Sequence, residues 1–270
     1  MKVSNYTYHI ILAITLSGVF LIEAKAQTNV SLSLPEVMFQ YTSNAPLVLQ
    51  HIFLQNPENR VTAIVGGRGS GKSTLLKLLV RLYKPSYGEI KMGGMKVSSI
   101  NPRRWRELCS GIMQDGKNFN DTMLNDIVLD DEHINNVRVR MRVRVSTLIT
   151  QIEGEINEMP KGFDTMLGET GRSLSGGQKQ RLLIAHALYC DPKYLFLDEA
   201  LDTINEQKIV EALKGASVGR TVIIAHRLST IRHADQIVVL NKGFIAEVST
   251  HEDLMAKNGV YASLVKSQFT

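Results

Sequence analysis

A glycine-rich segment, GGRGSGKST over residues 66–74, has the residue types and spacing of a phosphate-binding loop. It matches the pattern GxxxxGKS/T through Gly66, Gly71, Lys72 and Ser73. Glycines let consecutive backbone N–H groups turn toward one centre, and the N-terminus of a following helix adds positive potential. In such a loop Lys72 would neutralise the β- and γ-phosphates of a nucleotide, and Ser73 would bind Mg²⁺. The segment therefore predicts a nucleoside triphosphate site.

Two adjacent carboxylates, Asp198 and Glu199, follow the apolar run of residues 194–197. A buried carboxylate costs free energy unless it binds a metal, a proton or a partner. In a nucleotide site Asp198 would hold the Mg²⁺, directly or through water, and Glu199 would orient or deprotonate the attacking water. The alternative, a surface pair that caps the next helix, is disfavoured because four apolar residues, 194–197, precede the pair and predict a buried strand.

The elements around these groups alternate between strands and helices, which favours an α/β domain with a largely parallel core sheet. Apolar, alternating or β-branched runs predict strands at 31–41, 60–67, 88–94, 194–200 and 220–226, and a hairpin at 236–248 with its turn at 241–243. Helical spacing predicts helices at 73–83, across most of 123–160, at 176–189 and over 250–268, where Thr250 is the expected N-cap.

The segment VRVRMRVRV, residues 137–145, alternates strictly and predicts a strand with a basic face. Such a ribbon could contact nucleic acid, or it could be an exposed segment without a ligand. The exposed segment is the preferred interpretation, because no aromatic residues interleave for base stacking. We therefore expect no nucleic-acid partner.

The composition is that of a globular protein, since 44% of the 270 residues are hydrophobic, 21% are charged and the net charge is +5. Cys109 and Cys190 have no metal-ligand spacing and are expected to be small buried hydrophobes. Residues 1–27 form a signal-like or anchor-like segment, which we expect to lie outside the fold; the preferred interpretation is an unrelated start, with an uncleaved anchor or a true signal as alternatives. Its apolar run, residues 10–22, is shorter than the roughly 20 residues that span a bilayer.

LSGGQ at 174–178, together with the phosphate loop and FLDE at 196–199, resembles the nucleotide-binding domain of ABC transporters. GETGRSLSGGQKQR and AHRLST resemble the exporter branch, and MQDGKNFNDTMLNDI resembles bacterial exporters of bacteriocins and other peptides. The resemblance implies a P-loop NTPase fold over residues 28–270. It has a parallel core sheet, an N-terminal antiparallel β subdomain and a helical subdomain at about 115–185.

The resemblance also implies roles for individual residues. Tyr41 would stack on adenine, although a core tyrosine at a strand end is a competing interpretation. Gln114 would sense Mg²⁺ and the attacking water, and His226 would contact the γ-phosphate, so that Glu199, His226 and Gln114 form the catalytic set. Asp202 would belong to the loop that crosses a dimer interface. The implied metal ligands are Ser73, Gln114 and Asp198, and the implied nucleotide contacts are Tyr41, Gly66, Gly67, Arg68, Gly69, Ser70, Gly71, Lys72, Ser73, Thr74, Ser175, Gly176, Gly177, Gln178 and Asp202.

The implied function is that of the ATP-binding subunit of an ABC exporter, which hydrolyses Mg·ATP at a dimer interface. Ser175 and Gly177 would reach the nucleotide of a second nucleotide-binding domain, in a homodimer or with a paralogue. Transmembrane domains would be supplied in trans. The expected location is the cytoplasmic face of the bacterial inner membrane, either peripheral or anchored by residues 10–22.

Three features depart from the family pattern. The basic segment 137–145 falls where the family has its helical subdomain, and a helix remains possible there if tertiary packing overrides the local pattern. Exporters usually read DEATSALD where residues 198–202 read DEALD, and they usually have arginine in the place of His186. A loop three residues shorter would draw Asp202 back by several ångströms, since each extended residue spans about 3.3–3.6 Å. The alternative function is therefore a nucleotide-binding but hydrolysis-impaired fragment or regulatory module. A soluble ABC ATPase acting on nucleic acid or ribosomes is a weaker alternative, because one cassette without coiled-coil extensions is present.

Overall fold

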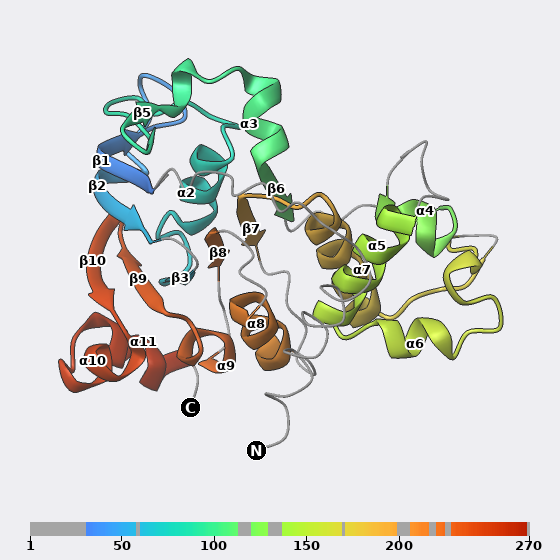
Figure 1. Ribbon diagram of the computed structural model, residues 1–270. Coiled ribbons are helices and arrows are strands. Elements are labelled where there is room, and N and C mark those ends of the chain that lie inside the picture. The colour runs from blue at the N-terminus through green and yellow to red at the C-terminus, as the bar shows by residue number, and fades with distance from the viewer. Residues whose placement is uncertain are drawn as a thin grey trace.

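The computed structural model describes residues 31–57, 60–112, 120–128, 137–168, 171–198, 206–215, 220–224 and 228–268 (Figure 1). This part of the chain contains two sheets, helices that pack against them, and a further group of helices with its own core. Among the described residues, no helix is both long and apolar enough to cross a bilayer.

The larger sheet has six strands in the order β10-β9-β3-β8-β7-β6. Strands β9, β3, β8, β7 and β6 run parallel, and β10 pairs antiparallel with β9. Every residue of β3 and of β7 is buried, as expected for central strands of a parallel sheet that is covered on both faces. The predicted parallel core sheet is confirmed. The strands are β3 (Val61–Val65), β6 (Cys109–Ile112), β7 (Tyr194–Asp198), β8 (Arg220–Ile224), β9 (Gln236–Asn241) and β10 (Phe244–Ser249).

The smaller sheet is antiparallel, with four strands in the order β2-β1-β4-β5. It confirms the predicted N-terminal antiparallel β subdomain, whose strands β1 and β2 Figure 1 shows in blue, with β2 beside β10. Its strands are β1 (Leu32–Phe39), β2 (Leu49–Asn56), β4 (Lys91–Met92) and β5 (Met95–Lys96).

Helices cover both faces of the six-stranded sheet, because side chains along each strand point alternately to the two faces. In β3, Val61, Ala63 and Val65 pack on one side, with α8 and α9, and Ile64 packs on the other side, with α2. The elements on and around this sheet are α2 (Lys72–Leu79), η1 (Val97–Ser99), α3 (Pro102–Leu108), α8 (Glu206–Gly215), α9 (Leu228–Arg232), α10 (His251–Ala256) and α11 (Val260–Gln268).

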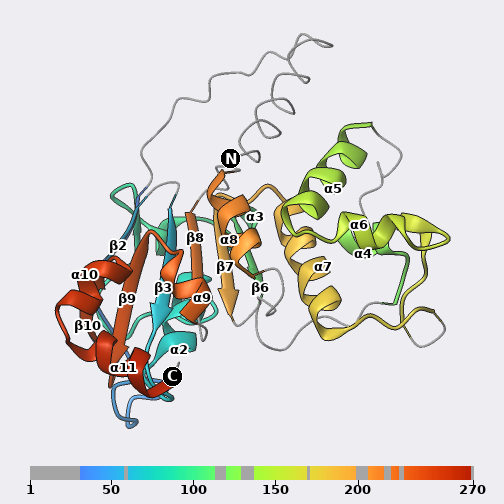
Figure 2. The ribbon, with the colours of Figure 1, turned by 90° about the horizontal axis from the view of Figure 1, so that it is seen from below.

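A helical subdomain lies beyond the β6 edge of the sheet, at the end opposite β10, as Figures 1 and 2 both show. It has its own apolar core, which includes Met123, Ile127, Ile152 and Leu182. Helix α7 joins this core to that of the sheet, because Leu182 packs in the former and Ile184 in the latter. The elements are α4 (Met123–Val128), α5 (Val137–Ile149), α6 (Glu153–Asn157), η2 (Gly162–Asp164) and α7 (Gly176–Tyr189).

The strand predicted at residues 137–145 is wrong, since this segment forms the first part of α5. A pattern with period two also contains the spacing of four residues, which brings Val139 and Val143 to one face of a helix, where both are buried. Arg142 donates to the Tyr189 carbonyl of α7, and its guanidinium lies 4.5 Å from the centre of the Tyr189 ring. Packing against α7 thus overrides the local strand pattern.

Three smaller expectations were also tested. Helix α2 ends at Leu79 rather than Tyr83, because Arg81 adopts a positive φ of 62°, and Leu82 is consequently exposed. The hairpin turn at 241–243 and the Thr250 N-cap are confirmed, and the Thr250 side chain accepts from the Asp253 N–H.

The two cysteines are less buried than expected. Cys109 is half-buried and Cys190 is exposed, so the prediction of two buried residues is wrong. Both thiols are free, and burial raises the pKa of Cys109 to about 12.

Candidate active site

The glycine-rich loop lies between β3 and α2, as the sequence predicts. Gly66 has a φ of 156°, and a Cβ atom built there would lie 2.2 Å from the carbonyl oxygen of Leu240 in β9. The outer side of the loop is held by the β9–β10 turn, where the Gly243 N–H donates to the Ser70 carbonyl over 3.1 Å. The loop therefore packs closely against β9 and the β9–β10 turn, and only glycine fits at position 66.

Lys72 is the first residue of α2 and is buried, with 7% of its surface exposed. Its ammonium group folds back over the loop and donates to the carbonyls of Gly66 at 2.8 Å and Gly67 at 3.1 Å. The backbone thus holds a cation at the start of a helix, where phosphate oxygens are favoured. Ser73 and Thr74 lie in the same first helical turn. These residues fit a nucleoside triphosphate and its Mg²⁺.

Tyr41 comes to this helix from the connection between β1 and β2. Its hydroxyl lies 2.9 Å from the Thr74 Oγ1, so one of the two hydroxyls donates to the other. The ring is 48% exposed and stands edge-on to the rings of Phe39 and Tyr83, with centroids 5.0 and 5.4 Å away. Tyr41 is therefore a half-exposed ring beside the phosphate loop rather than a core tyrosine.

Asp198 ends β7 and is buried, with 5% of its surface exposed. In the sheet register Asp198 lies opposite Ile224 of β8, and Ile224 lies opposite Ile64 of β3. Because β3, β8 and β7 run parallel, their carboxyl ends meet at one edge, and Asp198 reaches the edge at which Gly66 begins the phosphate loop. The structure brings these two predicted parts together.

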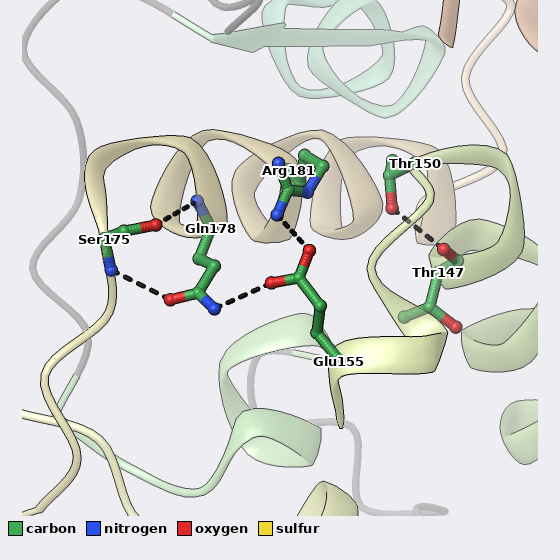
Figure 3. A network of polar contacts seen from close by, with 6 residues as sticks. All are labelled: Thr147, Thr150, Glu155, Ser175, Gln178 and Arg181. Carbon is green, nitrogen blue, oxygen red and sulfur yellow. Dashed lines mark hydrogen bonds and ion pairs between the residues drawn. The ribbon is translucent and has the colours of Figure 1, made fainter. Parts of the chain in front are cut away.

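The LSGGQ segment lies in the helical subdomain, where Ser175 is the N-cap of α7. Its hydroxyl accepts from the Gln178 N–H over 3.2 Å, and the Gln178 side-chain oxygen accepts from the Ser175 N–H over 2.9 Å. This reciprocal capping box organises the start of the helix (Figure 3). Ser175 and Gly176 are exposed, and a Cβ on Gly176 would meet nothing within 4 Å. The glycine is therefore not required by packing within this chain.

Four predicted residues, Gln114, Glu199, Asp202 and His226, lie outside the described residues, and so does the shortened turn after Asp198. Their roles remain predictions. His186, which stands where the family usually has arginine, lies with its Nδ1 2.7 Å from the Ile127 carbonyl oxygen and so links α7 to α4.

Glu155 of α6 contacts the LSGGQ segment, although no pattern in the sequence predicts this contact. One carboxylate oxygen accepts from the Gln178 Nε2 over 2.7 Å, and the other binds the Arg181 guanidinium (Figure 3). The surrounding sequence EGEIN reads only as a short acidic helix. No spacing rule links residue 155 to residues 175–181, because the contact depends on how α6 packs beside α7.

Comparisons with known proteins agree with this geometry. The family described as ABC transporter matches residues 49–202. The chain is 41% identical over 240 residues to an ATP-dependent lipid A-core flippase of Cupriavidus pinatubonensis, covering 86% of this chain and 40% of the flippase. It is 39% identical over 247 residues to ABC transporter B family member 19 of Arabidopsis thaliana, covering 90% of this chain and 19% of the plant protein.

Among solved structures, a bacterial Atm1-family ABC exporter with ATP bound matches with a TM-score of 0.79 and 34% identity, over 90% of this chain and 42% of the exporter chain. The chain thus spans about two fifths, or less, of the proteins named here. The predicted fold and the exporter-branch ATP-binding domain are confirmed, and nothing in the comparisons favours the hydrolysis-impaired alternative. From its match over residues 49–202 and its likeness to these exporters, the chain belongs to the ABC transporter family.

Proposed function

We propose that this chain binds Mg·ATP and hydrolyses it between two nucleotide-binding domains, and that this cycle drives export through membrane domains. The observation that carries the proposal is that two elements suited to bind anions lie in different parts of one chain. The loop that contains Lys72 lies at the edge of the six-stranded sheet. The exposed start of α7 instead belongs to the helical subdomain, where Gln178 donates to Glu155 of α6. Each element would be completed by the opposite element of a second domain.

At the phosphate loop, Lys72 would exchange its contacts with the Gly66 and Gly67 carbonyls for phosphate oxygens. Ser73, Asp198 and Gln114 would hold Mg²⁺, which neutralises charge on the β- and γ-phosphates when bound. Glu199 would orient and deprotonate the attacking water. His226 would contact the γ-phosphate from beyond the end of β8.

The start of α7 is suited to the γ-phosphate of a partner domain. The capping box uses the Gln178 N–H, and the Lys179 N–H donates to the Ser175 carbonyl over 3.0 Å. Among the first N–H groups of the helix, those of Gly176 and Gly177 therefore remain to face an anion. The Ser175 hydroxyl accepts from the helix and keeps its own proton for a phosphate oxygen. Asp202 would lie in the loop that crosses the same interface.

The transport role rests on the exporter relatives, which include a protein named as an ATP-dependent lipid A-core flippase. The second nucleotide-binding domain would be another copy of this chain or a paralogue. We place the complex at the cytoplasmic face of a bacterial inner membrane, with the chain peripheral or anchored by residues 10–22.

The test is steady-state ATP hydrolysis by the full chain over a range of protein concentrations. Turnover should rise faster than linearly with protein, because two chains form each site, and it should vanish in Glu199→Gln. Separately, Lys72→Ala should lower ATP affinity by about a hundredfold, because a charge-assisted contact is lost. Lys77→Ala, at the far end of α2, is the matched control and should bind ATP normally.

Either of two results would contradict the proposal. Unchanged ATP affinity in Lys72→Ala would exclude the phosphate loop as the binding site. Binding without turnover at any concentration would favour the hydrolysis-impaired module.

A further inference from the structure

Glu155 joins two positions on one face of α7. Gln178 and Arg181 are three residues apart, so their side chains lie one above the other on the helix. The two carboxylate oxygens of Glu155 bind one each, from the neighbouring helix α6 (Figure 3). Arg181 is buried, with a side chain that is 5% exposed, and it holds the carboxylate in place.

The contact with Glu155 decides which way the Gln178 amide faces. An ionised carboxylate only accepts hydrogen bonds, so the Gln178 NH₂ group must face it. The amide oxygen then faces the Ser175 N–H, which is the direction that the capping box requires. With the amide turned over, an NH₂ group would oppose an N–H, and both hydrogen bonds would be lost.

We propose that Glu155 is a positioning residue for the nucleotide-contacting end of α7. It acts through Gln178 to hold Ser175 in the orientation that presents its hydroxyl and the N–H groups of Gly176 and Gly177 outward. This inference rests on the proposed function for its consequence, which is closure of the dimeric site on ATP. The orientation of Gln178 and Ser175 is a property of the single chain and can be measured without nucleotide.

The first experiment measures amide hydrogen exchange at Ser175 by NMR on the full chain. Glu155→Gln keeps the shape of the side chain, but the new amide can either accept or donate a hydrogen bond. It therefore no longer selects one orientation of the Gln178 amide. We expect exchange at Ser175 to accelerate about tenfold, the scale of losing an N-cap contact. Glu153→Gln is the matched control, since Glu153 lies on the same helix and pairs with Arg144 of α5. It should leave Ser175 unchanged.

A double-mutant cycle separates positioning from general stabilisation. If Glu155 acts through Gln178, then Glu155→Gln should add no further acceleration at Ser175 in a chain that already carries Gln178→Ala. Melting temperatures of all variants show whether the whole domain has loosened. Equal exchange rates in Glu155→Gln and Glu153→Gln, or additive effects in the cycle, would overturn the proposal.

The second experiment measures ATP-dependent dimerisation by analytical ultracentrifugation in a Glu199→Gln background, with ATP affinity measured separately. Glu155→Gln should raise the dimer dissociation constant about tenfold, on the same scale as an N-cap contact, and leave ATP affinity of the monomer within about twofold. An unchanged dimer constant despite faster exchange would contradict the functional part of the inference. If the parent chain binds ATP but never dimerises, the proposed function fails, and the exchange measurement still decides the role of Glu155.

Discussion

The hydroxyl of Tyr41 lies 2.9 Å from that of Thr74, two residues after the lysine of the phosphate loop. This contact joins the connection between β1 and β2 to the first turn of α2. The antiparallel subdomain therefore supplies a ring beside the phosphate loop, and the rings of Phe39 and Tyr83 pack edge-on against it.

The position of Tyr41 predicts a graded effect on ATP affinity. Tyr41→Ala removes the stacking surface and should lower affinity about thirtyfold, the scale of losing one base–aromatic stack. Tyr41→Phe keeps the ring and loses only the bond to Thr74, so affinity should fall about threefold. Isothermal titration with ATP measures both. Equal losses in the two variants would show that the ring does not stack on the base.

Gly66 and Gly69 of the phosphate loop should differ in how well they tolerate substitution by alanine. Gly66→Ala places a Cβ 2.2 Å from a backbone oxygen and should lower the free energy of unfolding by at least about 3 kcal/mol. Gly69→Ala meets nothing within 4 Å and should cost only the strain of its positive φ of 75°, about 1 kcal/mol. Urea unfolding monitored by circular dichroism compares them. A Gly66→Ala chain as stable as the parent would contradict the close approach to Leu240.

Arg142 and Arg144 belong to the same alternating segment but should differ in their contribution to stability. Arg142→Ala loses a bond to the Tyr189 carbonyl and the contact with its ring, and should cost about 1.5 kcal/mol. Arg144→Ala loses the ion pair with Glu153, in which the Arg144 side chain is 69% exposed and the Glu153 side chain 11% exposed, and should cost less, about 0.7 kcal/mol. Urea unfolding of the two variants distinguishes them. Similar costs for both would mean that Arg142 does not fasten α5 to α7.

The sequence DEALD at 198–202, three residues shorter than the family pattern, predicts a gain of turnover when this segment is lengthened. Insertion of Thr-Ser-Ala between Ala200 and Leu201 restores the family length, which adds about 10 Å of reach. We expect ATP turnover per chain to rise while ATP affinity stays the same, because the phosphate loop is untouched. Steady-state hydrolysis of the parent and the insertion variant, at matched protein concentrations, measures the change. Unchanged turnover would show that the native turn already closes the site.

The features of this protein that depend on local pattern could be predicted from its sequence. The spacing of Gly66, Gly71 and Lys72 requires a phosphate loop, and the apolar run before Asp198 requires a buried strand. These features follow from backbone geometry and burial over a few residues, so they can be read without the fold. The hairpin at 236–248 and the Thr250 N-cap are of the same kind.

Features that depend on packing between distant segments could be established from the three-dimensional structure but not from the sequence. Residues 137–145 alternate like a strand, yet they form a helix because Val139 and Val143 bury against the helical subdomain. Glu155 carries no motif, yet it reaches Gln178 and Arg181 because α6 lies beside α7. The free energy of packing across a tertiary interface exceeds the weak conformational preference of a short segment. The spacing of residues along the chain does not indicate which surfaces will pack together.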